Sequence, residues 1–402
     1  MADTKKPEEQ IIARAAAFAE DILAARILIV DDMSLMRQMI GLCLSEAGFS
    51  ALSFAEDGVE ALEMIDQEMP ELVILDLNMP KMSGHEVCKA LRGDEKTKDL
   101  PILVQSASET PEERTEVFAS GATDFVSKPI NQPEMLARVC MHLENRFLIR
   151  SLQDFQAHMQ DELTMARDMQ QALLPGLREI QSVEKECNLR IESLYRASFE
   201  LGGDLWGGWP LGGGKYGIYV LDVVGHGVTA ALNTFRIHAT MARFNRNRLN
   251  PARFLNRLNQ ELYASLPTGQ FSTMFYAVLD TANGHLTYAG AGAPRPLIVS
   301  ERGVRLLDSS GIPIGIAETP GYENKTETLE PGESLFCYSD VLVEASDSAG
   351  EILGEDGFAS MVEGIACQVP QAALFRTILK QFLDGLPGPL PDDLTAVSVY
   401  RV

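Results

Sequence analysis

The chain has 402 residues and a formal net charge of −23, and this length favours two or three domains over one. Such a negative charge argues against nucleic acid or an anionic membrane as a partner, because both would repel the chain. The six cysteines lie far apart and form no CxxC pair, so we expect buried free thiols in a reducing compartment. Residues 1–26 lack the apolar core of a signal peptide, and no segment is apolar enough to span a bilayer. We therefore expect a soluble, cytoplasmic protein.

The first part of the chain alternates short apolar runs with amphipathic helical patterns. Residues 1–25 are expected to form an N-terminal extension with a helix over 11–25, where apolar residues recur at helical spacing. Buried parallel strands are expected at 27–30, 72–75, 102–104 and 125–127, with a weaker candidate at 52–55. The alternation predicts a doubly wound α/β domain over residues 26–145.

Carboxylates, a hydroxyl and a lysine follow these strands. Asp31 and Asp32 come directly after the first strand, Asp76 ends the third, and Ser106 and Lys128 follow the last two. In a doubly wound sheet these positions converge at the carboxyl ends of the strands, where such folds bind ligands. The sequence therefore predicts a cation site with an oxygen that can accept a phosphoryl group.

The segment from Ala25 to about Leu143 resembles the receiver domain of response regulators. The resemblance is carried, in the family's order and spacing, by Val30-Asp31-Asp32, Leu75-Asp76-Leu77-Asn78-Met79-Pro80, Gln105-Ser106-Ala107 and Ser127-Lys128-Pro129. It implies that a sensor histidine kinase or phosphotransfer protein phosphorylates Asp76. It also implies a Mg²⁺ ion whose protein ligands are Asp31, Asp32, Asp76 and the backbone carbonyl of Asn78.

Three further roles follow from the same resemblance. Lys128 would pair with the incoming phosphoryl group, and the Ser106 hydroxyl would hydrogen-bond to it. Phe125 stands where the family places an aromatic side chain whose rotation reports phosphorylation, although simple core packing also explains a phenylalanine there.

A long polar segment without glycine or proline links the two halves of the chain, between residues 143 and 174. Its apolar residues follow the spacing of a coiled-coil seam and then shift register: Leu148, Leu152, Phe155 and Met159, then Leu163, Ala166, Met169 and Leu173. A narrow apolar stripe needs a partner, which favours a parallel dimeric coiled coil over residues 146–175 and hence a homodimer. The alternative is a single helix packed on a domain. His142 and His158 in this linker are expected to be solvated.

From residue 189 to 402 the pattern changes to many strands with turn signals. Two helical stretches interrupt them, at 228–266 with a break near Asn250-Pro251, and at 370–386. Strands flanked by helices in this way predict two packed sheets covered by helices. The segment Gly212-Gly213-Gly214-Lys215 lacks the Walker spacing, so it is expected to be a hairpin turn and not a phosphate-binding loop.

Four short acidic motifs are scattered through this half, each beside a strand-like apolar run. They are Gly202-Gly203-Asp204, Leu221-Asp222-Val223-Val224-Gly225-His226-Gly227, Tyr338-Ser339-Asp340 and Pro391-Asp392-Asp393-Leu394-Thr395. Burying an unpaired charge is expensive, so the four motifs are expected to gather around something positive. Hard divalent cations prefer carboxylates and water. The motifs predict a dinuclear, oxygen-ligated metal site for phosphate chemistry.

The motifs, from about Met165 to Val402, resemble the PP2C-like serine/threonine phosphatases of the stage-II-sporulation-E-like subgroup. The resemblance implies an α/β/β/α sandwich over residues 176–402 that holds two Mn²⁺ or Mg²⁺ ions. Asp222 would bridge both ions and the Val223 carbonyl would bind one of them. The other ligands would be Asp204, Asp340 and Asp392, with Asp393 as an alternative or supporting ligand. His226 is not expected to bind a hard cation directly.

The implied reaction is hydrolysis of a protein phosphoserine or phosphothreonine by an activated water, and the family points to a phosphorylated anti-sigma-antagonist protein as substrate. Two departures weaken this reading. Gly207 or Gly208 stands where the family usually carries a second acid, and Val341 replaces a glycine after Asp340. A β-branched residue would be strained at positive φ. The rival is a non-enzymatic adaptor with a pseudo-phosphatase domain, but retention of the four principal acids favours the enzyme.

Overall fold

The computed structural model describes residues 20–106, 111–346 and 350–402. The chain divides into two compact units, Met1–His158 and Met159–Val402. Most of the helical extension expected at residues 1–25 lies outside the described residues, and within them residues 20–23 are helical. In the described part of the chain, no helix is both long enough and apolar enough to cross a membrane.

The first unit is built on a five-stranded parallel sheet with the order β2-β1-β3-β4-β5. The strands are β1 (Ile27–Val30), β2 (Leu52–Ala55), β3 (Leu72–Asp76), β4 (Ile102–Ser106) and β5 (Asp124–Ser127). The central strands β1, β3 and β4 are buried along their whole length, which explains their continuous apolar runs. The weaker candidate became β2, a partly exposed strand at the sheet edge.

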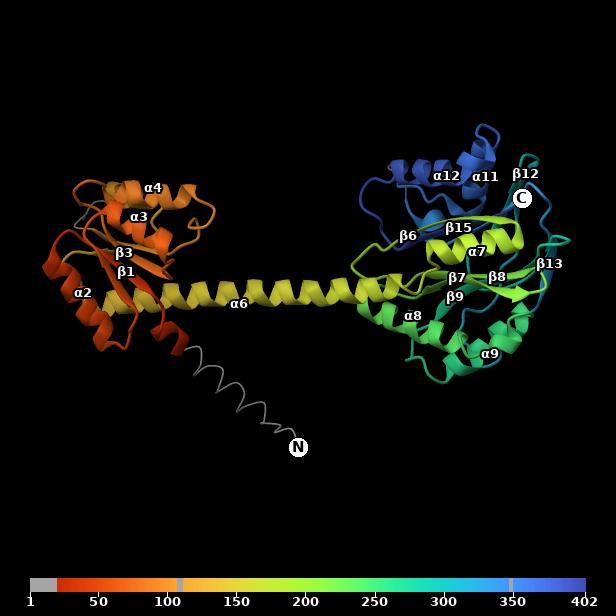
Figure 1. Ribbon diagram of the computed structural model, residues 1–402, viewed down its shortest axis with the longest axis horizontal. Helices are drawn as coiled ribbons and strands as arrows, with labels where there is room; N and C mark the ends of the chain where they lie inside the picture. Colours follow the sequence, from red (N-terminus) through yellow and green to blue (C-terminus); the bar gives the residue numbers. More distant parts are fainter. Residues whose placement is uncertain (1–19, 107–110, 347–349) are drawn as a thin grey trace. The chain divides into compact units, whose positions relative to one another are not determined.

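Helices cover both faces of this sheet: α2 (Ser34–Glu46), α3 (Gly58–Gln67), α4 (Gly84–Gly93), α5 (Pro111–Ala119) and the first part of α6 (Gln132–Gln171). Successive residues of β1 face opposite sides. Ile27 and Ile29 pack with α2 and α6, whereas Leu28 and Val30 pack with α3, α4 and α5 (Figure 1). The prediction of a doubly wound fold is confirmed.

Helix α6 is 40 residues long and begins earlier than the expected linker. Its first turns are part of the first unit, where Val139 and Leu143 are fully buried. The seam residues Leu148, Leu152 and Phe155 are 57%, 57% and 60% exposed. The apolar stripe is therefore uncovered in the single chain, and the coiled coil stays a prediction.

The second unit contains two five-stranded antiparallel sheets, ordered β13-β10-β9-β8-β7 and β12-β11-β14-β15-β6. The first sheet comprises β7 (Leu205–Gly212), β8 (Lys215–Val223), β9 (Ser272–Asp280), β10 (His285–Ala291) and β13 (Lys325–Thr328). The second comprises β6 (Leu189–Arg196), β11 (Leu297–Ser300), β12 (Gly303–Leu306), β14 (Ser334–Tyr338) and β15 (Leu394–Arg401).

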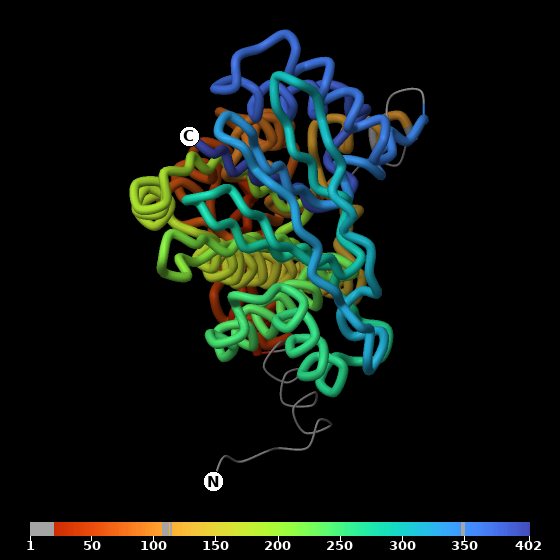
Figure 2. Tube along the Cα trace, turned by 90° about the vertical axis from the view of Figure 1, so that its right-hand side faces the viewer, coloured from red at the N-terminus to blue at the C-terminus, as the bar shows by residue number. Residues whose placement is uncertain are grey.

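Helices cover the outer faces of both sheets. Figure 2 shows the green helices α8 (Gly227–Met241) and α9 (Pro251–Tyr263) on one side of the strands and the blue helices α11 (Gly354–Ala366) and α12 (Gln371–Gly385) on the other. Trp206, Phe275 and Val397 belong to the core between the sheets, which α7 (Leu177–Cys187) closes on one side. The predicted α/β/β/α sandwich is confirmed.

Two details of the second unit bear on the sequence predictions. The hairpin turn is confirmed, because Gly212 pairs with Lys215 between β7 and β8 and glycines 212–214 all have positive φ. The expectation of only two helical stretches is wrong, because α11 is a third. Glycines at 354, 357 and 364 weaken its helical pattern, and its Phe358 and Val362 are fully buried against the second sheet.

The cysteines are all unpaired, as expected. Four of them are buried, Cys140 is half-buried, and Cys367 is exposed. The expectation that all six are buried is therefore wrong for Cys367, which caps the C-terminal end of α11.

Candidate functional site

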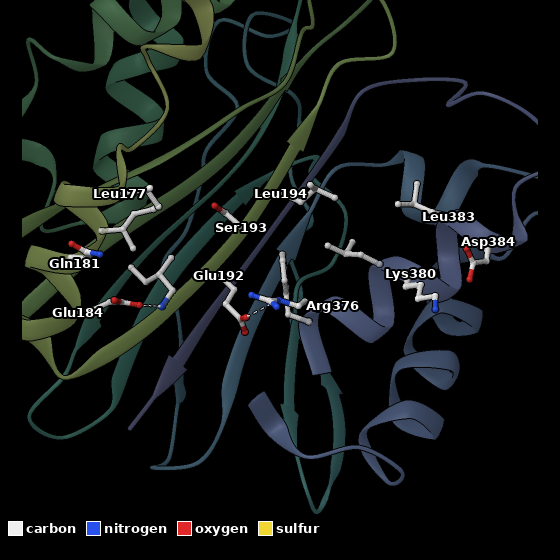
Figure 3. Close-up of a pocket in the computed structure, with 14 residues that line it drawn as sticks. Leu177, Gln181, Glu184, Glu192, Ser193, Leu194, Arg376, Lys380, Leu383 and Asp384 are labelled. Atoms are coloured by element: carbon white, nitrogen blue, oxygen red, sulfur yellow. Dashed lines mark hydrogen bonds and ion pairs between the residues drawn. The ribbon is translucent and has the colours of Figure 1, made fainter. Parts of the chain in front are cut away.

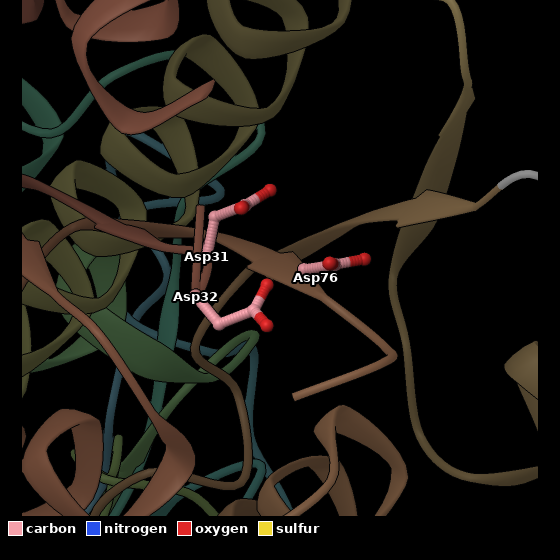
Figure 4. A group of neighbouring side chains, drawn as sticks. All are labelled: Asp31, Asp32 and Asp76. Carbon is pink, nitrogen blue, oxygen red and sulfur yellow. The ribbon is translucent and has the colours of Figure 1, made fainter. Parts of the chain in front are cut away.

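The acidic cluster of the first unit lies at the carboxyl ends of β1 and β3. Carboxylate oxygens of Asp31, Asp32 and Asp76 come within 4.8 Å of one another (Figure 4). Asp31 and Asp76 are buried, and Asp32 is exposed. Burial and the negative charge of Asp76 both raise the pKa of Asp31, against a hydrogen bond from the Met33 N–H and the charge of Lys128. Three oxygen donors with an excess of negative charge fit a hard divalent cation.

Lys128 reaches into this cluster from the loop after β5. Its Nζ atom lies 2.9 Å from Oδ1 of Asp76 and 3.3 Å from Oδ2 of Asp31. The Lys128 backbone N–H donates to the carbonyl of Ser106 at 2.8 Å, which ties this loop to the end of β4. The Lys128-Pro129 peptide is cis. The structure thus brings together the acids and the lysine that the sequence predicted.

The remaining predicted residues of this unit surround the cluster. Ser106 is the last residue of β4 and is buried, whereas Asn78 is exposed two residues beyond β3. Phe125, on β5, is half-buried and packs edge-to-face on Phe118 with ring centroids 5.9 Å apart. The guanidinium of Arg138, on α6, lies 5.8 Å from the Phe125 ring.

An ion-pair network next to Phe125 holds α6 on the sheet. Asp124, at the start of β5, accepts hydrogen bonds from Arg138 at 2.6 and 2.7 Å. Nε2 of His142 lies 3.0 Å from Oδ2 of Asp124. The expectation that His142 is solvated is wrong, because its side chain is only 12% exposed and faces this carboxylate. Burial acts to raise the pKa of Asp124, but the bonds from His142 and Arg138 outweigh it and lower that pKa.

In the second unit, the four acidic motifs lie at strand ends of both sheets. Asp204 precedes β7, Asp222 lies near the end of β8, Asp340 follows β14 and Asp392 precedes β15. Burial raises the pKa of Asp222 to about 8, and the negative charges of Asp340, Asp392 and Asp393 add to the shift. Acids up to 171 residues away in sequence (Asp222 to Asp393) therefore act on one carboxylate.

Asp204 shows most directly that this site suits a cation. Its side chain is buried, and its Oδ2 has no hydrogen-bond partner among the described residues. Burial and the charges of Asp222 and Asp393 raise the pKa of Asp204 well above its ordinary value. An orphaned buried carboxylate oxygen is costly, and a divalent cation would relieve it. Among the described residues only the first-unit acids gather within 4.8 Å, so the ligand oxygens of the second-unit acids lie farther apart than those of the first unit.

Asp340 stands in helical backbone conformation at the start of α10 (Val341–Glu344). Burial raises its pKa to about 6, with further contributions from the negative charges of Glu344 and Asp392. Val341 is the first residue of that helix and is buried in the core beneath it. Positive φ at non-glycine residues of the described chain occurs at Lys81 and Asn188. The replacement of glycine by Val341 therefore introduces no backbone strain.

The adjacent acids Asp392 and Asp393 differ in their contacts. Oδ1 of Asp393 accepts hydrogen bonds from the N–H and hydroxyl of Ser198, at 2.7 and 2.9 Å, and Oδ2 accepts one from the N–H of Gly203 at 2.6 Å. Among the described residues, Asp392 accepts one hydrogen bond, from the N–H of Asp393 at 2.8 Å. Asp393 thus holds the Gly202–Asp204 loop in place, and Asp392 keeps oxygen lone pairs for a ligand.

Close backbone packing surrounds the Val223 carbonyl. A Cβ atom on Gly203 would lie 2.5 Å from the Val223 oxygen and 3.1 Å from the Gly225 oxygen. The Gly203 carbonyl accepts a hydrogen bond from the hydroxyl of Thr234 at 2.8 Å. Only glycine lets the loop that carries Asp204 approach the end of β8 this closely.

Tyrosine rings fill the space beside the glycines that replace the family's second acid. A Cβ atom on Gly207 would lie 2.5 Å from the Tyr219 hydroxyl oxygen, and one on Gly208 would lie 2.1 Å from that of Tyr216. Both tyrosines are buried. A carboxylate has no room at either position while these rings are present.

Further contacts connect residues around the site. The Ser339 hydroxyl accepts the N–H of Thr395 at 2.9 Å and donates to the carbonyl of Asp393 at 3.1 Å, so it joins the third and fourth motifs. Exposed Phe199 stacks on His226 with ring centroids 4.4 Å apart. His226 immediately precedes α8.

A groove of about 640 Å³ lies elsewhere on the second unit, between α7, β6 and α12 (Figure 3). The Ile191 N–H donates to Glu184 at 2.8 Å, and Arg376 lies 4.0 Å from Glu192. The lining contains no residue of the four acidic motifs. The groove is therefore separate from the candidate metal site.

Comparisons with known proteins match a segment of each unit to a known family. Residues 27–140 match the family model of the response regulator receiver domain, and residues 212–402 match that of stage II sporulation protein E (SpoIIE). The phosphoserine phosphatase RsbP of Bacillus subtilis is 29% identical over 203 residues, which are 49% of this chain and 48% of RsbP. The phosphoserine phosphatase RsbU of the same organism is 25% identical over 254 residues, 63% of this chain and 73% of RsbU.

The match to RsbP thus spans about half of that relative's length. Among solved structures, the SiaA-PP2C domain of Pseudomonas aeruginosa superposes with a TM-score of 0.54 at 24% identity, over 60% of this chain and 97% of that domain. This likeness shows the fold of the second unit. The chain thus contains a segment that matches the response regulator receiver domain, residues 27–140, and a segment that matches SpoIIE, residues 212–402, within a unit of PP2C-like fold.

Proposed function

We propose that the chain is a two-component response regulator whose output is a metal-dependent protein serine/threonine phosphatase. A sensor histidine kinase or phosphotransfer protein phosphorylates Asp76, and the phosphorylated receiver controls the second unit. The observation that carries the proposal is the set of four acids around Asp222, which holds excess negative charge at the ends of two packed sheets. The similarity to two proteins named phosphoserine phosphatases supports the substrate class.

In this proposal Asp222, Asp204, Asp340 and Asp392 would hold two divalent cations, Mn²⁺ or Mg²⁺, together with the Val223 carbonyl, and Asp222 would be shared by both. Bound cations supply an acidified water and offset the charge on the phosphoryl oxygens. Asp393 positions the loop that carries Asp204, because its two oxygens already accept three hydrogen bonds.

A cavity of about 470 Å³ beside Asp340 and Asp392 is the proposed place for the substrate chain. Its wall is largely apolar, with Val341, Ala345 and Leu386. A phosphorylated side chain could reach the acids while flanking residues contact this wall. We propose a phosphorylated regulator of the anti-sigma-antagonist type as the protein substrate, by analogy with the family.

In the first unit we propose that Asp31, Asp32 and the Asn78 carbonyl hold Mg²⁺ with Asp76. Lys128 and the Ser106 hydroxyl then bind the phosphoryl group that Asp76 receives. The Phe125 side chain rotates when Asp76 is phosphorylated. This rotation affects α6, because Phe125 packs next to the Asp124 network that anchors the helix. The exposed stripe of α6 pairs with a second chain in a parallel coiled coil, and its packing transmits the signal.

The proposal is tested by Mn²⁺-dependent hydrolysis of a generic aryl phosphate and of a phosphoserine protein. Asp222→Asn should lower kcat at least about 100-fold, because removal of the bridging carboxylate disturbs both cation sites. Asp384→Asn, an exposed acid on α12, is the matched control and should behave as the wild type. A folded wild-type protein that hydrolyses nothing with Mg²⁺ or Mn²⁺ would instead indicate the adaptor, in which the receiver gates binding of a regulatory protein.

A further inference from the structure

Strand β6 is the last strand of the second sheet in the described part of the chain, with β15 as its neighbour. In an antiparallel pair, the N–H and C=O groups of alternate residues point toward the partner strand, and those of the residues between them point away. The Asn188 carbonyl accepts the Val402 N–H, so the even-numbered residues of β6 pair with β15. The odd-numbered residues therefore direct their N–H and C=O groups outward, at the edge of the sheet.

Part of this edge is already capped. The Ile191 N–H donates to a carboxylate oxygen of Glu184, on α7, at 2.8 Å, as the outward direction requires. Ser193 is the next outward residue. It is exposed, and its backbone N–H and C=O have no hydrogen-bond partner among the described residues. Proteins usually cover or charge a sheet edge, which prevents pairing with another chain. At Ser193 the edge is open.

The groove between α7, β6 and α12 gives this open edge an apolar wall on each side (Figure 3). Helix α7 packs with Ile191 and α12 packs with Leu194, so the two helices flank opposite faces of β6. Leu177 of α7 is 79% exposed in the groove, and Leu383 of α12 is half-buried. A strand added beside β6 would direct alternate side chains to the two walls. The groove therefore suits an extended segment that is apolar on both faces.

The charges on α12 add a requirement for that segment. Arg376 and Lys380 are exposed at the rim of the groove, one helical turn apart. Arg376 lies 4.0 Å from Glu192 of β6, so this end of α12 runs beside the start of the strand. An acidic side chain on the α12 face of the added strand would complement these two cations. Asp384, one further turn along α12, would repel an acid, which restricts the acid to the end of the groove near Arg376.

The position of the groove favours the phosphorylated substrate as its occupant. Ser193 is five residues from Ser198, whose N–H donates to Asp393 at 2.7 Å. Five residues span at most about 18 Å. A folded domain of about 100 residues is wider than this, with a radius of gyration of about 13 Å. A single substrate domain can therefore reach both the acidic site and the groove.

We propose that the groove is a docking site for an extended segment of the phosphoprotein substrate, which adds a strand to the edge of β6 at Ser193. The segment is apolar on both faces and carries an acidic residue beside Lys380. In this mode of recognition, main-chain hydrogen bonds supply affinity and the walls supply specificity. The inference rests on the proposed function and adds a substrate contact outside the acidic site.

The test measures hydrolysis of two synthetic phosphoserine peptides by the full chain with Mn²⁺. The short peptide places phosphoserine among glycines and serines. The long peptide adds the strand Val-Ile-Val-Asp-Val behind a glycine-serine linker of about 12 residues, whose r.m.s. length of about 19 Å matches the span. Linkers of this kind give effective concentrations in the mM range. The long peptide should therefore have a KM about tenfold below that of the short one, with kcat unchanged.

Ser193→Pro tests the backbone contact. It removes the outward N–H but no hydrogen bond to β15, and proline is tolerated at such edge positions. The variant should lose most of the tenfold gain and still hydrolyse the short peptide and an aryl phosphate as the wild type does. If Ser193→Pro fails to fold, N-methylation of the central valine of the long peptide removes the amide that would donate to the Ser193 carbonyl, and should have the same effect.

A charge reversal tests the α12 wall. Lys380→Glu should raise the KM of the long peptide several-fold, and a lysine in place of the peptide's aspartate should reverse this loss. Lys185→Glu, the same substitution at an exposed lysine of α7 outside the groove lining, is the matched control and should behave as the wild type.

Three results would overturn the docking site. The first is an equal KM for the two peptides, and the second is a gain that survives both Ser193→Pro and N-methylation. The third is a gain that disappears as the concentration of the chain is raised, which would indicate that a second copy of the chain fills the groove. A wild-type chain that hydrolyses neither peptide nor an aryl phosphate would instead overturn the proposed function, and the docking of a substrate with it.

Discussion

Asp392 and Asp393 are neighbours in sequence but have different surroundings. Asp393 accepts three hydrogen bonds from Ser198 and Gly203, whereas Asp392 accepts one from its neighbour. Buried donors must keep their acceptors, so Asp393 contributes to the stability of the folded loop. A carboxylate with free lone pairs and acidic neighbours is better suited to a cation. Mutation of Asp393 should therefore lower the stability of the folded protein, whereas mutation of Asp392 should weaken cation binding.

We expect Asp393→Asn to lower the free energy of unfolding by about 1 to 3 kcal/mol in metal-free buffer. The new NH₂ group cannot accept the Gly203 N–H, which is left buried without a partner. Asp392→Asn should leave this free energy nearly unchanged, since its amide oxygen can still accept the Asp393 N–H, but should weaken Mn²⁺ binding. Urea denaturation with EDTA, paired with Mn²⁺ titration, measures both. Equal stability losses for the two variants would contradict this division of roles.

The sequence predicted the four acids of the second unit but not the residues that hold their loops in place. Asp204, Asp222, Asp340 and Asp392 lie in short motifs beside strands, so a local pattern reveals them. Gln170 lies in the helix end from Met165 to Pro175 that resembles the entry to the phosphatase domain, but its burial arises only when α6 meets the Gly202 loop. Ser198 and Ser339 are likewise defined by contacts between distant segments. No local pattern carries that information.

At the scale of elements, α6 carries an uncovered apolar stripe. Leu148, Leu152 and Phe155 are each more than half exposed, and apolar residues at this spacing pair in coiled coils. We expect the wild-type chain to be a dimer by size-exclusion chromatography with light scattering. Leu152→Glu should shift it toward monomer, because the new charge would be buried in the seam. Gln153→Glu, one position away from the seam, is the control. A monomeric wild type would rule out the coiled coil.

The contact between β5 and α6 depends on Asp124. Its folded pKa is lowered from the ordinary 3.8, so its contribution to stability is present above that pH and is lost as pH falls through the folded pKa. Asp124→Asn should destabilise the first unit by about 1 to 3 kcal/mol at neutral pH. The difference between wild type and variant should shrink below about pH 4. Denaturation of both proteins across this range gives the comparison, and a difference independent of pH would exclude the ion pairs as its cause.

The elements differ in how well sequence patterns predicted them. The buried strands β1, β3 and β4 are continuous apolar runs, and α9 has a clear start at Asn250-Pro251, where the Asn250 side chain caps the Arg253 N–H. Helix α11 was missed because glycines interrupt its pattern, and only packing on the second sheet stabilises it. Helix α6 begins at Gln132, before the expected linker, and its first turns are buried in the first unit.

At the scale of the whole molecule, one chain combines a phosphoryl-accepting site with a second acidic site. Treatment with beryllium fluoride, which mimics a phosphoryl group on aspartate, should change the phosphatase rate or the oligomeric state. The added negative charge at Asp76 shifts the conformational equilibrium of the residues around Phe125 and thereby changes the conformation of α6. Asp76→Asn should lose this response but keep basal Mn²⁺-dependent hydrolysis. Identical behaviour of treated and untreated wild type in both assays would mean that the receiver controls something else.

A fluorescent label on Cys367 can be used to follow changes in the oligomeric state. It is the one fully exposed thiol, since the other cysteines are buried or half-buried, and maleimide dyes react fastest with accessible thiolates. A fluorophore attached there would sit at the end of α11, on the covering layer of the second sheet. Energy transfer between two labelled chains could then follow their separation in real time without introducing any foreign cysteine.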